Sequence, residues 1–283
     1  KINDFSWRLS TSYSANKNTV KTDAVENYEL NDYLSGNAVV SGEAVGTFYS
    51  YKYLGLNSKN GIPVFDDYTD RRHLLEDKTL EEVVKLVMVN SGNREPKFNG
   101  NLYNTFTWRG ITLSFNLAYS LGSKVRLFAL YSPIISGVSA EANVRKEFNN
   151  RWQVPGDEKR TDIPAIINRS DEMFSVYNHH WSQHQTNKTK NFANSLWNMY
   201  DNSDLRVVSG NYLKMQNLTI RYSLQKQLLK KTPFSSASIS FSTQNLFTIS
   251  AKELKGQDPS QAGFAKPNLS IRPTYTIGLN VSF

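Results

Sequence analysis

Polar and apolar residues alternate with a period of two along the last ten residues, TYTIGLNVSF (274–283). The apolar positions are Tyr275, Ile277, Leu279, Val281 and Phe283. Such alternation predicts a β-strand with one apolar and one polar face. About ten residues is the length of a strand that crosses an outer membrane. The edge strand of a soluble β-sandwich would have the same pattern, so the segment leaves both folds open.

Six further segments are strand-like and together predict an all-β chain. They are 5–14, 44–56, 99–108, 111–122, 212–224 and 237–249. Only Arg109 and Gly110 separate two of these segments, which predicts a tight antiparallel hairpin. Tyr49, Tyr51, Tyr53 and Trp108 lie near predicted strand ends, where aromatic side chains form girdles at the membrane interface.

The connections between these segments alternate in length. One connection has two residues and another about a dozen, whereas 57–97, 122–211 and 250–272 are long. A compact soluble domain rarely contains loops beyond ~15 residues, but outer-membrane barrels combine short periplasmic turns with long external loops. The pattern therefore predicts a transmembrane antiparallel β-barrel whose C-terminus is periplasmic. The connection 16–43 is an exception, because it is long for a periplasmic turn.

Seven strands would form an open sheet, whose unpaired edges lipid does not tolerate. We therefore expect a part of a barrel whose other strands lie elsewhere. No signal peptide opens the chain, so if the protein is exported we expect an N-terminus produced by processing or truncation.

Composition narrows the class of protein further. The chain has 283 residues, of which 39% are hydrophobic and 12% aromatic, and its mean hydropathy is -0.51. No run approaches the ~20 apolar residues of a membrane-spanning helix. The absence of cysteine excludes disulfides and thiolate metal sites. The net charge of +8 is spread along the chain, with dense patches only at KKTPF and RKEFNNR, which does not favour nucleic-acid binding.

Residues with catalytic or metal-binding potential are few. The chain has no G-x-S-x-G, P-loop or H-E-x-x-H motif, so we expect no enzyme and no cofactor. His180 and His184 could share a metal on one helix face, but a third ligand is missing nearby. The pairs Asp66-Asp67 and Asp157-Glu158 could bind a hard cation, although such pairs in polar loops are more often solvated turn residues.

The long connection 122–211 is rich in aromatic residues. Its members Trp152, Tyr177, Trp181, Trp197 and Tyr200 are candidates for stacking on sugar rings or packing on a partner protein. Packing of the loop on itself is an equally good interpretation for any one of them. The segment 77–90 predicts a short amphipathic helix, with Thr79 and Glu82 as a capping box, that packs onto neighbouring loops.

Several longer strings carry a family resemblance. The segments GEAVGTFYSYKYLGLNSKNGIPVF (42–65), GNREPKFNGNLYNTFTWRGITLSFNLAYSLGSKV (92–125) and NVRKEFNNRWQVPGDEKRTDIP (143–164) resemble, in this order, segments of SusC/RagA-type TonB-dependent outer-membrane transporters. The strings SGNYLKMQNLTIRYSL, STQNLFTI and GQDPS are similar to the closing part of that family. Ser50 and Asn57 depart from its usual Gly and Asp, and 178–192 matches no pattern of the family.

The resemblance implies a fold and a function. Residues 1–283 would form the C-terminal portion of a barrel of about 22 strands, roughly its last seven, with long extracellular loops; the plug domain and the TonB-contacting box would lie outside this chain. The protein would be an outer-membrane nutrient importer of oligosaccharides or peptides, energised through TonB. A SusD-like surface lipoprotein would be its partner, and membrane lipid or lipopolysaccharide would surround it. Tyr275, Ile277, Leu279, Val281 and Phe283 would be the C-terminal signal for barrel assembly. The alternatives are a carbohydrate-binding β-sandwich and a passive porin or adhesin barrel.

Overall fold

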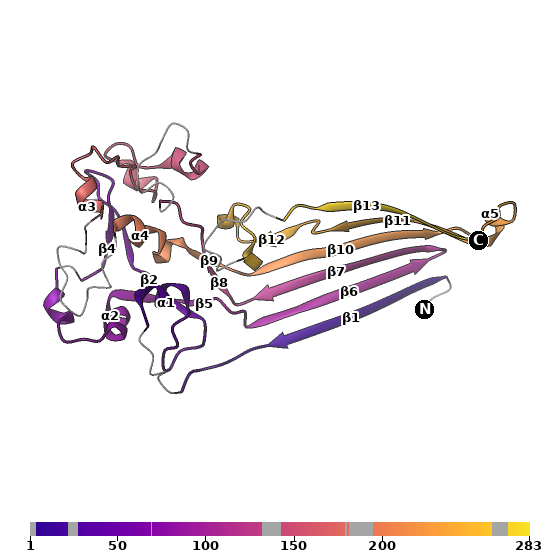
Figure 1. The fold of residues 1–283 in the computed structure, drawn as a ribbon, viewed down its shortest axis with the longest axis horizontal. Coiled ribbons are helices and arrows are strands. Elements are labelled where there is room, and N and C mark those ends of the chain that lie inside the picture. The colour runs from indigo at the N-terminus through magenta and orange to yellow at the C-terminus, as the bar shows by residue number, and fades with distance from the viewer. Residues whose placement is uncertain are drawn as a thin grey trace.

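One wide antiparallel sheet and a cluster of loops at one of its ends make up the fold (Figure 1). The computed structural model describes residues 4–21, 28–68, 70–131, 143–178, 180, 195–261 and 271–283. The six long strands, in spatial order, are β1 (Phe5–Ala15), β6 (Phe98–Trp108), β7 (Ile111–Leu121), β10 (Tyr212–Ser223), β11 (Ser236–Gln244) and β13 (Thr274–Ser282). A seventh, short strand, β12 (Thr248–Ser250), pairs with β10.

The hairpin of β6 and β7 forms as the sequence predicts. Trp108 pairs with Ile111, and the two turn residues have φ angles of 46° at Arg109 and 85° at Gly110. Two successive left-handed residues are what a two-residue type I′ turn requires. The turn therefore fixes the register of the two strands.

The apolar face of the sheet is exposed. Directly opposed residues of antiparallel strands share a face, so the pairs Phe241–Ile277 and Ile239–Leu279 lie on the same side. Ile277 is 77% exposed and Leu279 is 70% exposed. In a β-sandwich a second sheet would bury this face. The sheet therefore has the distribution of apolar side chains that the barrel interpretation predicts.

The opposite face of the sheet carries small polar side chains. One transverse row joins residues from four neighbouring strands: Ser114, Thr219, Ser242 and Thr276. The hydroxyls of Thr219 and Ser242 lie 3.1 Å apart. A polar face of this kind suits the lumen of a barrel.

The predicted strand 237–249 is interrupted. Its two parts, β11 and β12, both pair with β10, and Asn245 between them has a φ of 53°. The register of β10 with β7 shifts between Met215 and Asn217 at the same level, and the N–H of Met215 donates to the carbonyl of Phe247 at 3.0 Å. The interruption is thus a local irregularity.

Shorter elements occupy the connections. The small sheets pair β2 (Thr47–Tyr51) with β5 (Met88–Asn93), β3 (Tyr53–Leu56) with β4 (Pro63–Phe65), and β8 (Lys124–Arg126) with β9 (Val207–Ser209). The α-helices are α1 (Leu30–Ser35), α2 (Leu80–Val87), α3 (Phe174–Asn178), α4 (Leu196–Asp201) and α5 (Lys226–Leu229). The 3₁₀ helices are η1 (Arg72–Leu75), η3 (Lys146–Asn150), η4 (Asp157–Lys159), η7 (Asp204–Arg206), η8 (Lys252–Leu254) and η9 (Pro259–Gln261). No α-helix within the described ranges combines the length and apolarity needed to span a bilayer.

The prediction that 44–56 is a barrel strand is wrong. All five residues of β2 are buried, with Tyr49 4% and Tyr51 0% exposed, and Tyr53 packs partly buried beside them. These tyrosines therefore do not belong to an interfacial girdle. Other loop residues cover both faces of β2, so its aromatic side chains are buried and do not form a face that could contact lipid. Trp108, in contrast, is 52% exposed at its strand end, where a girdle residue is expected.

Without 44–56 the connection lengths alternate fully. The connections β1–β6, β7–β10 and β11–β13 are long, and the connections β6–β7 and β10–β11 are short. The anomalous segment 16–43 becomes part of the long connection 16–97. Both short connections, the start of β1 and the C-terminus lie at the end of the sheet opposite the loops (Figure 1). The structure thus removes the one exception in the sequence pattern.

Candidate functional site

The three long connections fold together into one unit. We call the described residues of 16–97, 122–211 and 245–273 the loop domain. Its core joins residues from β2, α2 and α4, including Tyr51, Val84 and Met199, each fully buried. The helix predicted over 77–90 is present but shorter: α2 ends at Val87, and Met88 begins strand β5. Thr79 and Glu82 form its capping box as predicted. The loop domain, rather than the sheet, therefore contains the hydrophobic core of the chain.

Tyr131 lies at the centre of an aromatic cluster. Its ring centroid is 4.5 Å from that of Trp197 and 5.3 Å from that of Tyr200, and Tyr177 lies 4.4 Å from Trp197. The Tyr131 hydroxyl donates to the carbonyl of Pro164. Burial is the main cause that raises the pKa of Tyr131, Tyr177 and Tyr200 well above the usual value of a phenol. The three hydroxyls therefore stay neutral, and the rings of these tyrosines pack the loops together.

The predicted contact residues of the 122–211 connection are mostly interior. Trp152 is 8%, Tyr177 0%, Trp197 3% and Tyr200 1% exposed, and Trp181 lies outside the described residues. The structure therefore assigns the four described side chains a packing role. Their contact with a substrate or partner stays a prediction. The local sequence does not indicate that these side chains are buried, because their burial depends on contacts between connections that are far apart in the chain.

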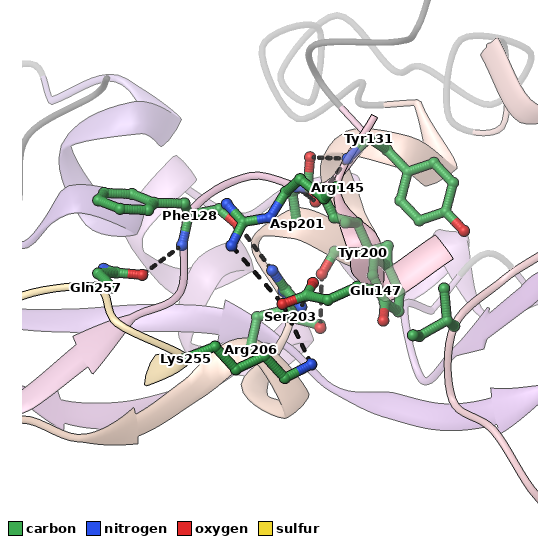
Figure 2. A network of polar contacts seen from close by, with 12 residues as sticks. Phe128, Tyr131, Arg145, Glu147, Tyr200, Asp201, Ser203, Arg206, Lys255 and Gln257 are labelled. Atoms are coloured by element: carbon green, nitrogen blue, oxygen red, sulfur yellow. Dashed lines mark hydrogen bonds and ion pairs between the residues drawn. The ribbon is translucent and has the colours of Figure 1, made fainter. Parts of the chain in front are cut away.

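A network of charged residues around the buried Glu147 and Arg206 ties the second connection to the third (Figure 2). The Arg206 guanidinium lies 3.5 Å from the Glu147 carboxylate and donates to the carbonyl of Phe128 at 2.7 Å. Lys255, from the third connection, approaches the same carboxylate at 3.4 Å. Arg206 is 5% and Glu147 8% exposed, so solvent screens the pair little. Sequence patterns gave no indication of this network.

Two further groups in Figure 2 fix the backbone around Tyr131. The Asp201 carboxylate accepts from the N–H of Leu130 at 2.7 Å and from the N–H of Tyr131 at 3.0 Å. The side-chain oxygen of Gln257 accepts from the N–H of Phe128 at 3.1 Å. Buried backbone donors are thus satisfied by side chains from α4 and from the third connection.

Arg126 joins the first connection to the second. Its guanidinium donates to the carbonyls of Leu34, Tyr49 and Ser203 at 3.2, 2.9 and 3.3 Å. Burial lowers the pKa of Arg126 to about 10, so the side chain remains a cation at neutral pH. One side chain therefore holds three segments that are far apart in the sequence.

An open, polar cleft lies where the second and third connections meet. Its volume is about 680 Å³. Charged residues of both signs line it: Glu147, Arg151, Asp157, Arg160, Asp162, Arg206, Glu253 and Lys255. Tyr200 also lines the cleft but is 1% exposed, so it offers little aromatic surface there. Such a lining can bind groups of either charge by hydrogen bonds and ion pairs.

The predicted acidic pairs are engaged within the chain. The Asp157 carboxylate accepts from the N–H groups of Val154 and Gln153 at 3.1 and 3.0 Å, and these bonds lower its pKa. Asp66 forms ion pairs with Lys52 at 3.2 Å and Arg71 at 2.6 Å. Asp157 thus stabilises a turn, and Asp66 belongs to a group of ion pairs.

The histidine pattern does not assemble a metal site in the described part of the chain. His180 Nε2 lies 2.6 Å from an Asp67 carboxylate oxygen, while His179 and His184 lie outside the described residues. Within the ranges that the structure describes, no three His, Asp or Glu side chains gather as metal ligands.

The terminal strand β13 lies at one edge of the sheet, and the apolar residues predicted over 274–283 are exposed. Their exposed fractions are 60% for Tyr275, 77% for Ile277, 70% for Leu279, 40% for Val281 and 85% for Phe283. Tyr275 stacks on Phe241 of the neighbouring strand. A role of this strand in barrel assembly stays a prediction.

The structure is mostly β, with an antiparallel sheet that exposes its apolar face and has the long connections at one end. No protein-family model matches the chain. The chain is 23% identical to "TonB-dependent receptor P3" of Formosa agariphila, over 99% of this chain and 27% of that protein. The resemblance predicted from the sequence motifs is thereby confirmed.

Solved structures of the RagAB peptide transporter share the fold. The RagAB peptide transporter superposes with a TM-score of 0.65 at 17% identity, over 100% of this chain and 28% of the other. The open-open state of the RagAB peptide importer gives a TM-score of 0.60 at 17% identity, over 100% of this chain and 27% of the other. The chain thus spans about a quarter of the length of the relatives it matches.

Proposed function

We propose that this chain is the C-terminal barrel portion of an outer-membrane nutrient importer that is energised through TonB. The observation that carries the proposal is the exposed apolar face of the sheet, with Ile277 77% and Leu279 70% exposed, in a chain similar to a TonB-dependent receptor over 99% of its length. In lipid such a face is in contact with acyl chains. The edge strands β1 and β13 then pair with strands that lie outside this chain, since an unpaired edge is costly in a bilayer.

The loop domain would be the extracellular part of this importer. The long connections lie together at one end of the sheet, as the external loops of outer-membrane barrels do. A SusD-like lipoprotein would dock over these loops, and the plug and TonB-contacting box would belong to the remainder of the protein. The buried network around Arg206 and Glu147 would hold the loops in one arrangement when a partner or substrate binds.

Peptides are the substrate class that the cleft favours over oligosaccharides. Its lining combines carboxylates and cationic side chains, whereas the aromatic rings that would stack on sugars are buried in the described loops. A peptide carries charges of both signs and backbone donors and acceptors, which such a lining can pair. The charge-reversing change Glu253→Lys should then lower uptake of cationic peptides more than uptake of anionic ones. Glu172→Lys, an exposed position that does not line the cleft, is the matched control.

A gene deletion in the source bacterium tests the function. We expect the deletion strain to lose uptake of labelled oligopeptides, and a protonophore should abolish uptake in the parent strain. Uptake that persists with the proton gradient collapsed would support the passive porin alternative instead. Loss of oligosaccharide uptake with peptide uptake intact would contradict the substrate class while leaving the importer in place.

We further propose that β13 acts as the assembly signal of the barrel. Phe283 is 85% exposed and terminates the alternating apolar series. Phe283→Ala should reduce the amount of protein assembled in the outer membrane several-fold. Phe247→Ala, which removes a phenyl ring from a position 39% exposed between β11 and β12, should leave assembly unchanged.

A further inference from the structure

The short connection between β10 and β11 carries an unpaired cluster of cations. This segment, residues 224–235, contains α5 and is called here the basic turn. Lys226, Lys230 and Lys231 are all exposed, and the segment contains no acidic residue. Within the described residues none of the three lysines forms an ion pair with a carboxylate. The basic turn lies beside the C-terminus, at the end of the sheet opposite the loop domain (Figure 1).

The basic turn is fastened to the end of the apolar face. Phe234 packs edge-on against Phe283 with ring centroids 5.2 Å apart, and the N–H of Ser235 donates to the carbonyl of Ser282 at 2.7 Å. Leu229 is 7% exposed and anchors α5, whereas Leu228 is 61% exposed. The lysines and one exposed leucine are thus presented together by a defined structure.

The spacing from the end of β10 places Lys226 at the level of lipid headgroups. The apolar series of β10 continues through Tyr222 to Leu224, and Lys226 follows two residues later. Two residues of extended chain cover about 7 Å. The headgroup layer on each side of a bilayer is roughly 5–8 Å thick, by the difference between total and hydrocarbon thickness. Lys226 therefore reaches the phosphate level when the apolar face is immersed in hydrocarbon.

We propose that the basic turn binds the phosphate groups of anionic phospholipids in the periplasmic leaflet. The inference rests on the proposed placement of the sheet in the outer membrane, in which short turns are periplasmic. Positive charge near the membrane attracts phosphates, and Leu228 can enter the acyl boundary beside them. The pair Asp4–Arg109, 3.2 Å apart, is neutral as a whole and does not offset the charge of the three lysines. A soluble acidic protein would fit the charge but not the exposed leucine and phenylalanine at the edge of the apolar face.

Lipid selectivity of the native protein tests the proposal. The protein is purified from its membrane in detergent and its binding to cardiolipin and to phosphatidylcholine is compared by native mass spectrometry. The test variant is Lys226→Gln/Lys230→Gln/Lys231→Gln. The control variant is Lys17→Gln/Lys59→Gln/Lys159→Gln, which removes the same charge from exposed positions in the loop domain. Co-flotation with vesicles of phosphatidylcholine, with and without cardiolipin, checks membrane insertion separately.

We expect the parent and the control variant to prefer cardiolipin. The preference should fall on the order of a hundredfold in the test variant, since each lysine near an anionic surface contributes about fivefold. Added salt should weaken the preference of the parent. A test variant that retains the parental preference, or a control variant that loses it equally, would overturn the proposal. In that case, insertion of the parent into neutral vesicles would still support the barrel. Failure of the parent to insert into either vesicle would overturn the proposed function together with this inference.

Discussion

Gly61 lies so close to the indole of Trp152 that a Cβ atom at Gly61 would stand 2.4 Å from the ring carbon Cδ2. Gly61 also has a φ of 67°, in the left-handed region. Trp152 belongs to the second long connection and Gly61 to the first, so this contact is one of the places where the loop domain is closed. The absence of a side chain at Gly61 lets the two connections meet.

Gly61→Ala should therefore destabilise the loop domain. We expect a cost of about 1–3 kcal/mol for the overpacked contact, in addition to about 1 kcal/mol for the left-handed alanine. Gly42→Ala is the matched control, because Gly42 has a φ of 84° but no atom within 4 Å of the place that a Cβ would take. Hydrogen exchange of peptides containing Trp152 measures the difference. Equal protection in the two variants would show that the close contact between Gly61 and Trp152 does not contribute to the stability of the loop domain.

Asp201→Ala should loosen the backbone at Leu130 and Tyr131. The change leaves two buried N–H groups without their acceptor, at about 1–3 kcal/mol for each. Hydrogen exchange of these two amides should accelerate strongly. Asp70→Ala, at a carboxylate 77% exposed, should change stability by no more than about 0.5 kcal/mol. Unchanged exchange in Asp201→Ala would refute the bracing role of this carboxylate.

Acid should release the third connection through Asp258. Burial would raise the pKa of Asp258, but hydrogen bonds from Ser260 and the ion pair with Lys214 at 3.2 Å outweigh it, so the pKa lies below 3.8. A carboxylate whose pKa is depressed by folding stabilises the fold fully above its unfolded pKa, and this contribution disappears as the pH falls through the folded pKa.

Limited proteolysis of the segment 251–261 at pH values from 6 down to 2 measures this effect. Cleavage by an acid-active protease should rise only below about pH 4, the ordinary range of an aspartate. Asp258→Asn should be cleaved more readily at pH 6 and show a weaker dependence on pH. A pH dependence that is identical in the parent and in Asp258→Asn would assign the acid response to another group.

Charge on the two faces of β13 should have opposite consequences. Ile277→Arg places a cation on the exposed apolar face and should cost about 2–4 kcal/mol near the middle of a bilayer. Thr276→Arg, on the polar face of the same strand, should be tolerated. The yield of heat-modifiable, folded protein in the outer membrane measures both. Similar yields for the two variants would contradict the assignment of the faces.

The long strands were predictable because their information is local. Alternation marks the two faces of β13, and the Arg109-Gly110 turn sets the register of β6 and β7 without any distant contact. The same pattern gave a wrong prediction for the segment around Tyr51, because aromatic residues fit both a lipid-facing strand and a strand buried on both faces. Only the packing of the loops distinguishes these two environments.

The cleft and its supporting network were not predictable from local pattern. Arg206, Glu147 and Lys255 are separated by long stretches of chain, and the basic patch RKEFNNR around Glu147 does not indicate which distant residues it contacts. The sequence shows that 122–211 is rich in aromatic residues, but it does not show how they are oriented. Tyr177 and Trp197, for example, are oriented by tertiary contacts. Burial of these rings is decided by the joint folding of three connections.

Lipid accessibility along β13 tests the central claim most directly. These 283 residues contain no cysteine, so single cysteines can be placed at each position from 274 to 283 and spin-labelled in the native protein in its membrane, after any cysteine in the remainder of the protein has been replaced by serine. The account predicts that labels at 275, 277, 279 and 281 collide with oxygen dissolved in lipid, whereas labels at 274, 276, 278 and 280 collide with a water-soluble relaxant. Uniform protection of the odd positions from both relaxants would mean that another protein layer covers the apolar face, and would contradict a membrane-spanning sheet.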